Sequence, residues 1–151
     1  MSDSLDIFLF NSCSSDLCST GYTVLLDRIK DISRLVSSKV KELKGFEINV
    51  IIADGRTMRG LNKRFRRVDS STDVLAFPFD EPGFGEIWLC PSVIEKNAKK
   101  YNQSFDLELI RVLIHGMLHL GGYDHKGKFI SSSVSKEKMF RVQEQILSGL
   151  V

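Results

Sequence analysis

The sequence predicts an α/β fold of a single domain, in which one mixed four-stranded sheet is layered with helices. The 151 residues correspond to one ordinary domain, which buries roughly two-thirds of its unfolded surface around a single core. The hydrophobic pattern then follows the order strand, helix, strand, helix, two strands and three helices. We therefore expect residues 1–151 to fold as one unit, without an internal repeat or a linker.

The first part of the chain predicts two strands on either side of a long helix. A short apolar run in 6–11 is typical of a buried strand, and the Ser-rich segment 11–21 is expected to be a loop. Between residues 23 and 43 apolar residues recur every three or four positions, which predicts an amphipathic helix. Residues 46–52 alternate as a strand does and are apolar on the second face too, which indicates a central strand.

The middle of the chain predicts a helix followed by a hairpin. Asp54 is placed to cap a helix that runs to Phe65. Residues 74–79 and 85–90 have the composition of strands, and the turn-forming residues 80–83 lie between them. We expect these two strands to pair with each other.

Three helices complete the predicted fold. The first covers about 91–102, and Ser104 is placed to cap the second, which ends at the glycines 121–122. A loop over 126–133 then leads into a last helix that ends at Gly149.

The composition is that of a soluble globular protein, with 26% charged and 42% hydrophobic residues, which excludes a disordered or collagen-like chain. The net charge of +2 does not indicate a polyanion-binding protein, so any basic surface must be local. No apolar run approaches the roughly 18 to 20 residues that cross a bilayer, and the acidic N-terminal segment lacks the features of a secretory signal. We therefore expect a cytoplasmic protein.

The cysteines Cys13, Cys18 and Cys90 are few and odd in number. Such a set argues against a disulfide framework and favours reduced thiols. Cys13 and Cys18 can also ligate a metal ion, but no second Cys or His pair lies near them in the sequence. A loop thiol is therefore the simpler interpretation.

All three histidines lie within the eleven residues from His115 to His125. His115 and His119 are four residues apart on a predicted helix, so their rings project from one face and can hold one metal ion. Gly122 can take a positive φ, which lets the chain reverse and return His125 to the same ion. Three imidazoles with an open fourth position are typical of catalytic zinc, although imidazole also suits nickel and copper. The alternative is that each histidine makes an ordinary structural hydrogen bond.

The same histidine spacing occurs in zinc proteases with the pattern HExxHxxGxxH. Gly116 stands where these proteases carry the Glu that acts as general base, so a peptidase would need another base such as Asp124. Asp124 adjoins the third histidine and is also placed to orient a ligand imidazole or to assist a proton transfer.

Basic residues concentrate between positions 56 and 67, on the helix after Asp54 and at its exit. They are Arg56, Arg59, Lys63, Arg64, Arg66 and Arg67. Such a cluster can simply form a solvated face, but a local basic patch is also what phosphate contacts require. A tri-histidine metal site near guanidinium groups suits phosphodiester cleavage, because both stabilise charge on phosphate oxygens.

These residues lie in segments that resemble a known family. The segment His115–His125 is similar at every specified position to the signature HGxLHLxGYDH of the YbeY family of bacterial rRNA-maturation endoribonucleases. Residues 61–79 resemble the family's LN…YR…D…TNVLSFPF block, and residues 139–147 resemble its closing helix. Recognisable blocks cover about 48–147, and Glu86 departs from the family's usual Asp.

The resemblance implies a compact α/β sandwich with a zincin-like metal site on a helix, where His115, His119 and His125 hold one zinc ion. It implies a single-strand-selective endoribonuclease that acts in small-subunit (16S) rRNA maturation and ribosome quality control. Arg66 occupies the position of the family's functionally important arginine, and Arg66 and Asp124 are the candidate catalytic residues. The candidate RNA contacts are Arg59, Lys63, Arg66 and Arg67. The implied partners are single-stranded rRNA and the small ribosomal subunit.

Two alternatives stay open from the sequence. One is a non-catalytic, zinc-stabilised RNA-binding factor for ribosome assembly, and the less expected one is a zinc peptidase. The attacking nucleophile is also open, because water and the RNA 2′-hydroxyl both fit. The segment 126–133 is basic and Ser-rich where relatives are often acidic, so its contacts with substrate or partners are expected to differ.

Overall fold

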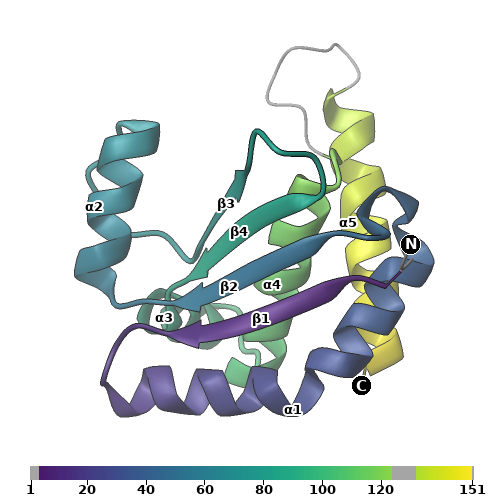
Figure 1. Ribbon diagram of the computed structural model, residues 1–151. Coiled ribbons are helices and arrows are strands. Elements are labelled where there is room, and N and C mark those ends of the chain that lie inside the picture. Colours follow the sequence, from purple (N-terminus) through teal and green to yellow (C-terminus); the bar gives the residue numbers. More distant parts are fainter. Residues whose placement is uncertain (1–3, 124–131, 151) are drawn as a thin grey trace.

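The protein is seen here as a computed structural model that describes residues 4–123 and 132–150 (Figure 1). The elements, in chain order, are β1 (Asp6–Asn11), α1 (Asp16–Lys39), the short 3-10 helix η1 (Lys41–Leu43), β2 (Glu47–Ile52), α2 (Gly55–Arg66), β3 (Val74–Pro78), β4 (Phe84–Leu89), α3 (Pro91–Lys100), α4 (Phe105–Leu120) and α5 (Ser132–Leu150). The predicted order of strands and principal helices is confirmed.

The four strands form one mixed sheet in the order β1-β2-β4-β3. β2 pairs in parallel with both β1 and β4, whereas β3 and β4 form the predicted antiparallel hairpin. In this register Leu9, Val50 and Ile87 lie beside one another across three strands. The central position predicted for β2 is therefore confirmed.

Helices α1, α4 and α5 lie together on one face of the sheet, whereas α2 stands at one end of it (Figure 1). The core between the sheet and these helices contains Val50, Ile87, Leu113 and Met117, all with no exposed surface. Met139 of α5 joins the same core and is 3% exposed. The interpretation of Met139 as an apolar core residue is confirmed.

Helix α1 begins earlier than the sequence predicts. Residues 16–21 are helical, so the predicted Ser-rich loop over 11–21 is wrong for its second half. Ser15 is the N-cap, and its hydroxyl accepts a hydrogen bond from the backbone N–H of Cys18 at 3.1 Å. Asp16 lies in the first turn, where the helix dipole favours a negative charge. The serine that suggested a loop therefore starts the helix.

The same early start brings two cysteines together. Cys13 precedes the cap and Cys18 lies in the first turn of α1, with their Cα atoms 6.2 Å apart. The two are joined by a disulfide, so the expectation of reduced thiols is wrong for this pair. Cys90 is a free, buried thiol.

Local capping signals predicted two other helix starts correctly. The Asp54 carboxylate accepts from the N–H of Thr57 at 2.8 Å at the start of α2. The hydroxyl of Ser104 accepts from the N–H of Leu107 at 3.1 Å at the start of α4. Among the residues described, no helix is long and apolar enough to cross a membrane.

Candidate metal centre

Two histidines meet on one face of α4. His115 and His119 are one helical turn apart, as predicted, with ring centroids separated by 4.6 Å. Their Nε2 atoms lie 3.0 Å from each other. The helix therefore points the same nitrogen of both rings towards a common position.

This geometry fits the donor set of a metal ion. Two nitrogens bound to one tetrahedral zinc at the usual bond length lie about 3.3 Å apart, and the two Nε2 atoms are 3.0 Å apart. The predicted third ligand, His125, and its neighbour Asp124 lie outside the described residues. Within the described ranges, no group of three or more metal-ligating side chains is found. The structure thus provides two imidazole donors in a suitable arrangement.

The end of α4 turns the chain back, as the glycines predict. Gly122 has a φ of 87°, and its N–H donates to the carbonyl of His119 at 3.0 Å. The N–H of Tyr123 donates to the carbonyl of Leu118, also at 3.0 Å. These two bonds form a Schellman motif, which requires a left-handed residue after the helix. The chain therefore leaves α4 directly beside the paired histidines.

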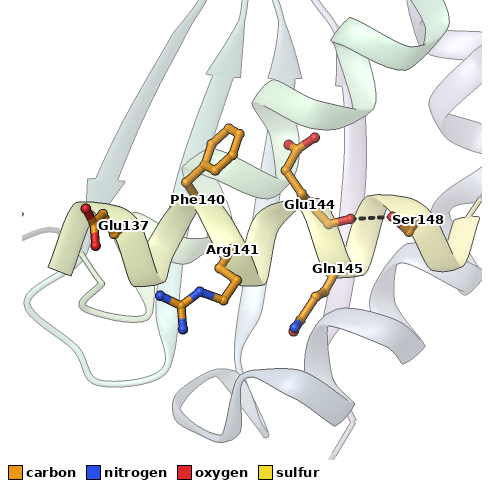
Figure 2. Close-up of a pocket in the computed structure, with 6 residues that line it drawn as sticks. All are labelled: Glu137, Phe140, Arg141, Glu144, Gln145 and Ser148. Carbon is orange, nitrogen blue, oxygen red and sulfur yellow. Dashed lines mark hydrogen bonds between the residues drawn. The ribbon is translucent and has the colours of Figure 1, made fainter. Parts of the chain in front are cut away.

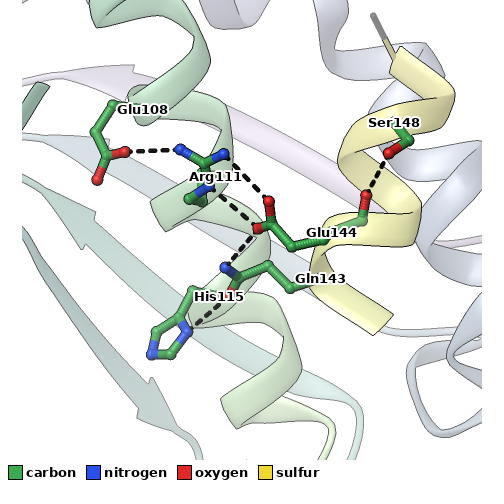
Figure 3. Close-up of polar contacts among 6 residues, drawn as sticks. All are labelled: Glu108, Arg111, His115, Gln143, Glu144 and Ser148. Carbon is green, nitrogen blue, oxygen red and sulfur yellow. Dashed lines mark hydrogen bonds and ion pairs between the residues drawn. The ribbon is translucent and has the colours of Figure 1, made fainter. Parts of the chain in front are cut away.

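A chain of polar contacts reaches His115 from α5 (Figure 3). The Nδ1 atom of His115 lies 2.8 Å from Oε1 of Gln143, and Nε2 of Gln143 donates to Glu144 at 3.1 Å. Glu144 receives two hydrogen bonds from Arg111, at 3.1 and 3.2 Å. Arg111 also donates to Glu108 at 3.0 Å. These five side chains connect α4 and α5 next to the candidate site.

Two carboxylates in this chain, Glu108 and Glu144, share the guanidinium of Arg111. Burial alone would raise the pKa of Glu144, but hydrogen bonds from Arg111 and Gln143 and the charge of Arg111 outweigh it and lower that pKa. The hydrogen bond with Glu144 in turn raises the pKa of Arg111. Glu144 is therefore a carboxylate at neutral pH, paired with a guanidinium.

The sequence analysis assigns no role to Gln143, which contacts His115, or to Glu144, Arg111 and Glu108, which lie behind it. Glu108 and Arg111 are charged residues three positions apart on a largely apolar helix, which is a detectable signal of a buried ion pair. Gln143 belongs to a segment recognised only by its resemblance to a closing helix. Its contact with His115 spans 28 residues, so no local pattern could have revealed it.

The basic residues predicted to contact RNA lie on a different element. Arg59 and Lys63 are exposed on α2, and Arg66 and Arg67 are exposed at its C-terminal end. Arg59 pairs with Asp69 at 2.7 Å. Figure 1 shows that α2 and α4 are separated from each other, with β3 and β4 between them. The structure brings His115 and His119 together but places the basic residues on a separate helix.

A buried asparagine fixes the segment that follows the basic helix. Asn62 is 3% exposed, and its Nδ2 donates to the carbonyl of Ser70 at 2.9 Å. Arg67 is the C-cap of α2 with a left-handed φ of 59°, and its N–H donates to the carbonyl of Lys63 at 3.1 Å. The exit of α2 is therefore held against the helix itself.

Two further features lie outside the histidine pair. Glu86, which stands where the family usually has Asp, accepts a hydrogen bond from the Trp88 indole at 2.9 Å and so has a structural partner.

A pocket of about 650 Å³ runs along α5 (Figure 2). Its lining residues are Glu137, Phe140, Arg141, Glu144, Gln145 and Ser148. None of these is one of the histidines.

The fold and this site define an α/β protein with a mixed sheet and a paired-histidine site on a covering helix. The family model described as Endoribonuclease YbeY matches residues 19–151. The chain therefore belongs to the endoribonuclease YbeY family, as its motifs predict.

Individual relatives agree with this assignment. An Endoribonuclease YbeY of Thermotoga neapolitana is 42% identical over 122 residues, covering 78% of this chain and 82% of the relative. One from Thermotoga maritima is 39% identical over 123 residues, covering 81% of each. The solution structure of a Thermotoga maritima protein superimposes with a TM-score of 0.68 at 32% identity, covering 95% of this chain and 88% of that one. The mixed α/β fold is thus shared with a solved structure.

Proposed function

We propose that this protein is a zinc-dependent, single-strand-selective endoribonuclease that acts in 16S rRNA maturation and ribosome quality control. Its partners are single-stranded rRNA and the small ribosomal subunit, and it acts in the cytoplasm as one domain over 1–151. The observation that carries the proposal is the pair of imidazole Nε2 atoms 3.0 Å apart in a chain of an endoribonuclease family.

Three histidines would hold the metal ion in this proposal. His115 and His119 supply the two nitrogens described above, and His125 follows the turn at Gly122 as the third ligand. A zinc ion bound there supplies Lewis-acid chemistry, which polarises a phosphate oxygen or makes a water molecule more acidic. The nucleophile would be water or the RNA 2′-hydroxyl.

The protein's own side chains bind and orient the RNA. Arg66 is permanently charged and has a planar fork of donors that matches phosphate oxygens, so we assign it to the scissile or an adjacent phosphate. Arg59, Lys63 and Arg67 lie on the same exposed region and supply sequence-independent backbone contacts. Asp124, next to the third histidine, orients that imidazole or moves a proton.

The test combines metal analysis with cleavage of a labelled single-stranded rRNA fragment by wild type and His119→Ala. About one zinc per chain in wild type, with cleavage lost in a folded His119→Ala variant, is the expected result. A duplex of the same sequence serves as the matched substrate and is expected to resist cleavage. Zinc binding without cleavage by wild type would overturn the enzymatic assignment and favour the RNA-binding assembly factor. Absence of bound metal would overturn the site itself.

A further inference from the structure

The Gln143 side chain is held in one orientation by its neighbours. An amide has one end that accepts and one that donates, whereas a carboxylate only accepts. Glu144 lies 3.1 Å from Nε2 of Gln143, so the donating end must face Glu144. The accepting Oε1 therefore faces Nδ1 of His115, at 2.8 Å. A rotated amide would place two acceptors against each other at the Glu144 contact.

This orientation selects one tautomer of His115. Because Oε1 of Gln143 only accepts, the Nδ1 atom of His115 must carry the proton that is shared in this contact. The neutral ring then has its lone pair on Nε2. That nitrogen is the one directed to the Nε2 atom of His119, 3.0 Å away.

The contacts behind Gln143 are rigid. Arg111 donates to both oxygens of Glu144 through two of its nitrogens, and its third nitrogen donates to Glu108 at 3.0 Å. The side chains of Glu108 and Arg111 are only 10% and 22% exposed, and Gln143 is 5% exposed. A planar guanidinium with several fixed partners has little freedom to rotate. The carboxylate that orients the amide is thus itself fixed.

We propose that Gln143 is a positioning residue that presents Nε2 of His115 to a divalent metal ion, and that Glu144 and Arg111 hold Gln143 in the required orientation. This inference rests on the metal site of the proposed function. A histidine that binds a metal through one ring nitrogen commonly donates a hydrogen bond from its second ring N–H to an oxygen acceptor. This bond fixes both the tautomer and the orientation of the ring. Here the acceptor is a neutral amide from a different helix, so α5 contributes to the site without providing a ligand.

The first experiment measures zinc affinity in the full chain with a competing chelator. Loss of such an outer contact typically weakens metal binding about 10- to 100-fold, and we expect this range for Gln143→Met. Gln145→Met is the matched control, because it makes the same change two residues along on an exposed position of α5, and it should leave the affinity unchanged. Glu144→Gln should weaken binding less, because the new amide can still accept from Nε2 of Gln143 but no longer excludes the rotated orientation of Gln143.

The second experiment needs neither metal nor RNA. Proton–nitrogen correlation spectra of the metal-free protein assign the tautomer of His115, which should carry its proton on Nδ1 in wild type and exchange between tautomers in Gln143→Met. An Nδ1 proton and an unchanged zinc affinity in a folded Gln143→Met variant would overturn the proposal. If Gln143→Met does not fold, an unchanged tautomer and affinity in Glu144→Gln would overturn the orienting role. A wild type that binds zinc but leaves RNA intact refutes the proposed enzyme alone.

Discussion

Gly116 of α4 lies directly against Ile87 of β4. A Cβ atom at Gly116 would be 3.2 Å from the Cγ2 atoms of both Ile87 and Val74. Position 116, directly after the first histidine, therefore faces the sheet. A zinc protease of the HExxH type carries its general base at the equivalent position. A glutamate at this position would enter the core, so the backbone of α4 itself argues against the peptidase alternative.

Substitution of Gly116 should therefore destabilise the protein. Gly116→Ala gains helix propensity but crowds two β-branched side chains, and we expect a net loss of about 1 kcal/mol in the free energy of unfolding. Gly60→Ala is the control, because a Cβ there meets nothing within 4 Å, and it should add about 0.5 to 1 kcal/mol. Urea denaturation measures both. A Gly116→Ala variant as stable as Gly60→Ala would contradict the close packing.

Removing the guanidinium between α4 and α5 should also destabilise the fold. Arg111→Met leaves Glu108 and Glu144 close together without their shared cation, at a site that is largely buried. We expect a loss of about 2 kcal/mol in the free energy of unfolding. Arg34→Met removes an ion pair whose side chains are 74% and 53% exposed and should change stability little. Equal effects of the two substitutions would argue against a structural role for Arg111.

The stability that Glu144 provides should depend on pH. Burial opposes its ionisation, but the contacts with Arg111 and Gln143 lower its pKa in the folded protein below the ordinary value of 4.5. The unfolded chain therefore takes up this proton first, so the contribution is complete above pH 4.5 and is lost as the pH falls through the folded pKa. Urea denaturation of wild type and Glu144→Gln should give a stability difference that shrinks in acid. A stability difference between wild type and Glu144→Gln that does not change with pH would show that the ionised Glu144 carboxylate is not its cause.

The basic helix should contribute through phosphate contacts. Lys63→Ala is expected to weaken binding of single-stranded RNA and to reduce the slope of log affinity against log salt by about 1. Lys99→Ala on α3, where the side chain is 79% exposed, is the control and should not alter the slope. Fluorescence anisotropy at several salt concentrations measures both variants.

Arg66→Ala should reduce RNA cleavage more than RNA binding. An equal reduction of cleavage and binding would make Arg66 an ordinary contact to the RNA backbone.

Reduction of the Cys13–Cys18 disulfide should have a limited effect on folding. The closed loop has a sequence separation of 5, and a loop this short restricts the unfolded chain by about 2 kcal/mol at most. Ser15 still caps α1 after reduction, because its hydrogen bond to Cys18 uses the backbone N–H. Thermal unfolding of the oxidised, reduced and Cys13→Ser proteins should show a small decrease in midpoint and the same cooperativity. Loss of the folded state on reduction would contradict this expectation.

Local signals predicted the parts of the fold that local interactions create. Asp54 and Ser104 cap helices through contacts three residues away, and the hairpin of β3 and β4 follows directly from its turn. The Ser-rich segment 11–21 predicts a loop because serine is common both in loops and at helix caps, and only the hydrogen bond between Ser15 and Cys18 distinguishes the two.

The candidate site also has parts that local sequence predicts and parts that depend on tertiary packing. The spacing of His115 and His119 on a helix was sufficient to predict that their rings meet. The partner of His115 was not predictable, because Gln143 reaches it only when α5 packs against α4. The position of Arg66 relative to the histidines likewise depends on how α2 attaches to the end of the sheet, which no sequence spacing specifies.

The sheet order β1-β2-β4-β3 has a consequence for how the chain folds. Asp6 pairs with Glu47 and Glu47 pairs with Phe84, so both parallel pairings join strands roughly forty residues apart, whereas β3 and β4 are adjacent in the chain. Closing such long loops costs entropy before the new contacts compensate for it, which slows folding. The hairpin can form first because its pairing is local, and it then offers β4 as a template for β2. Until β1 pairs with β2, the edge of β2 stays open to pairing with another chain.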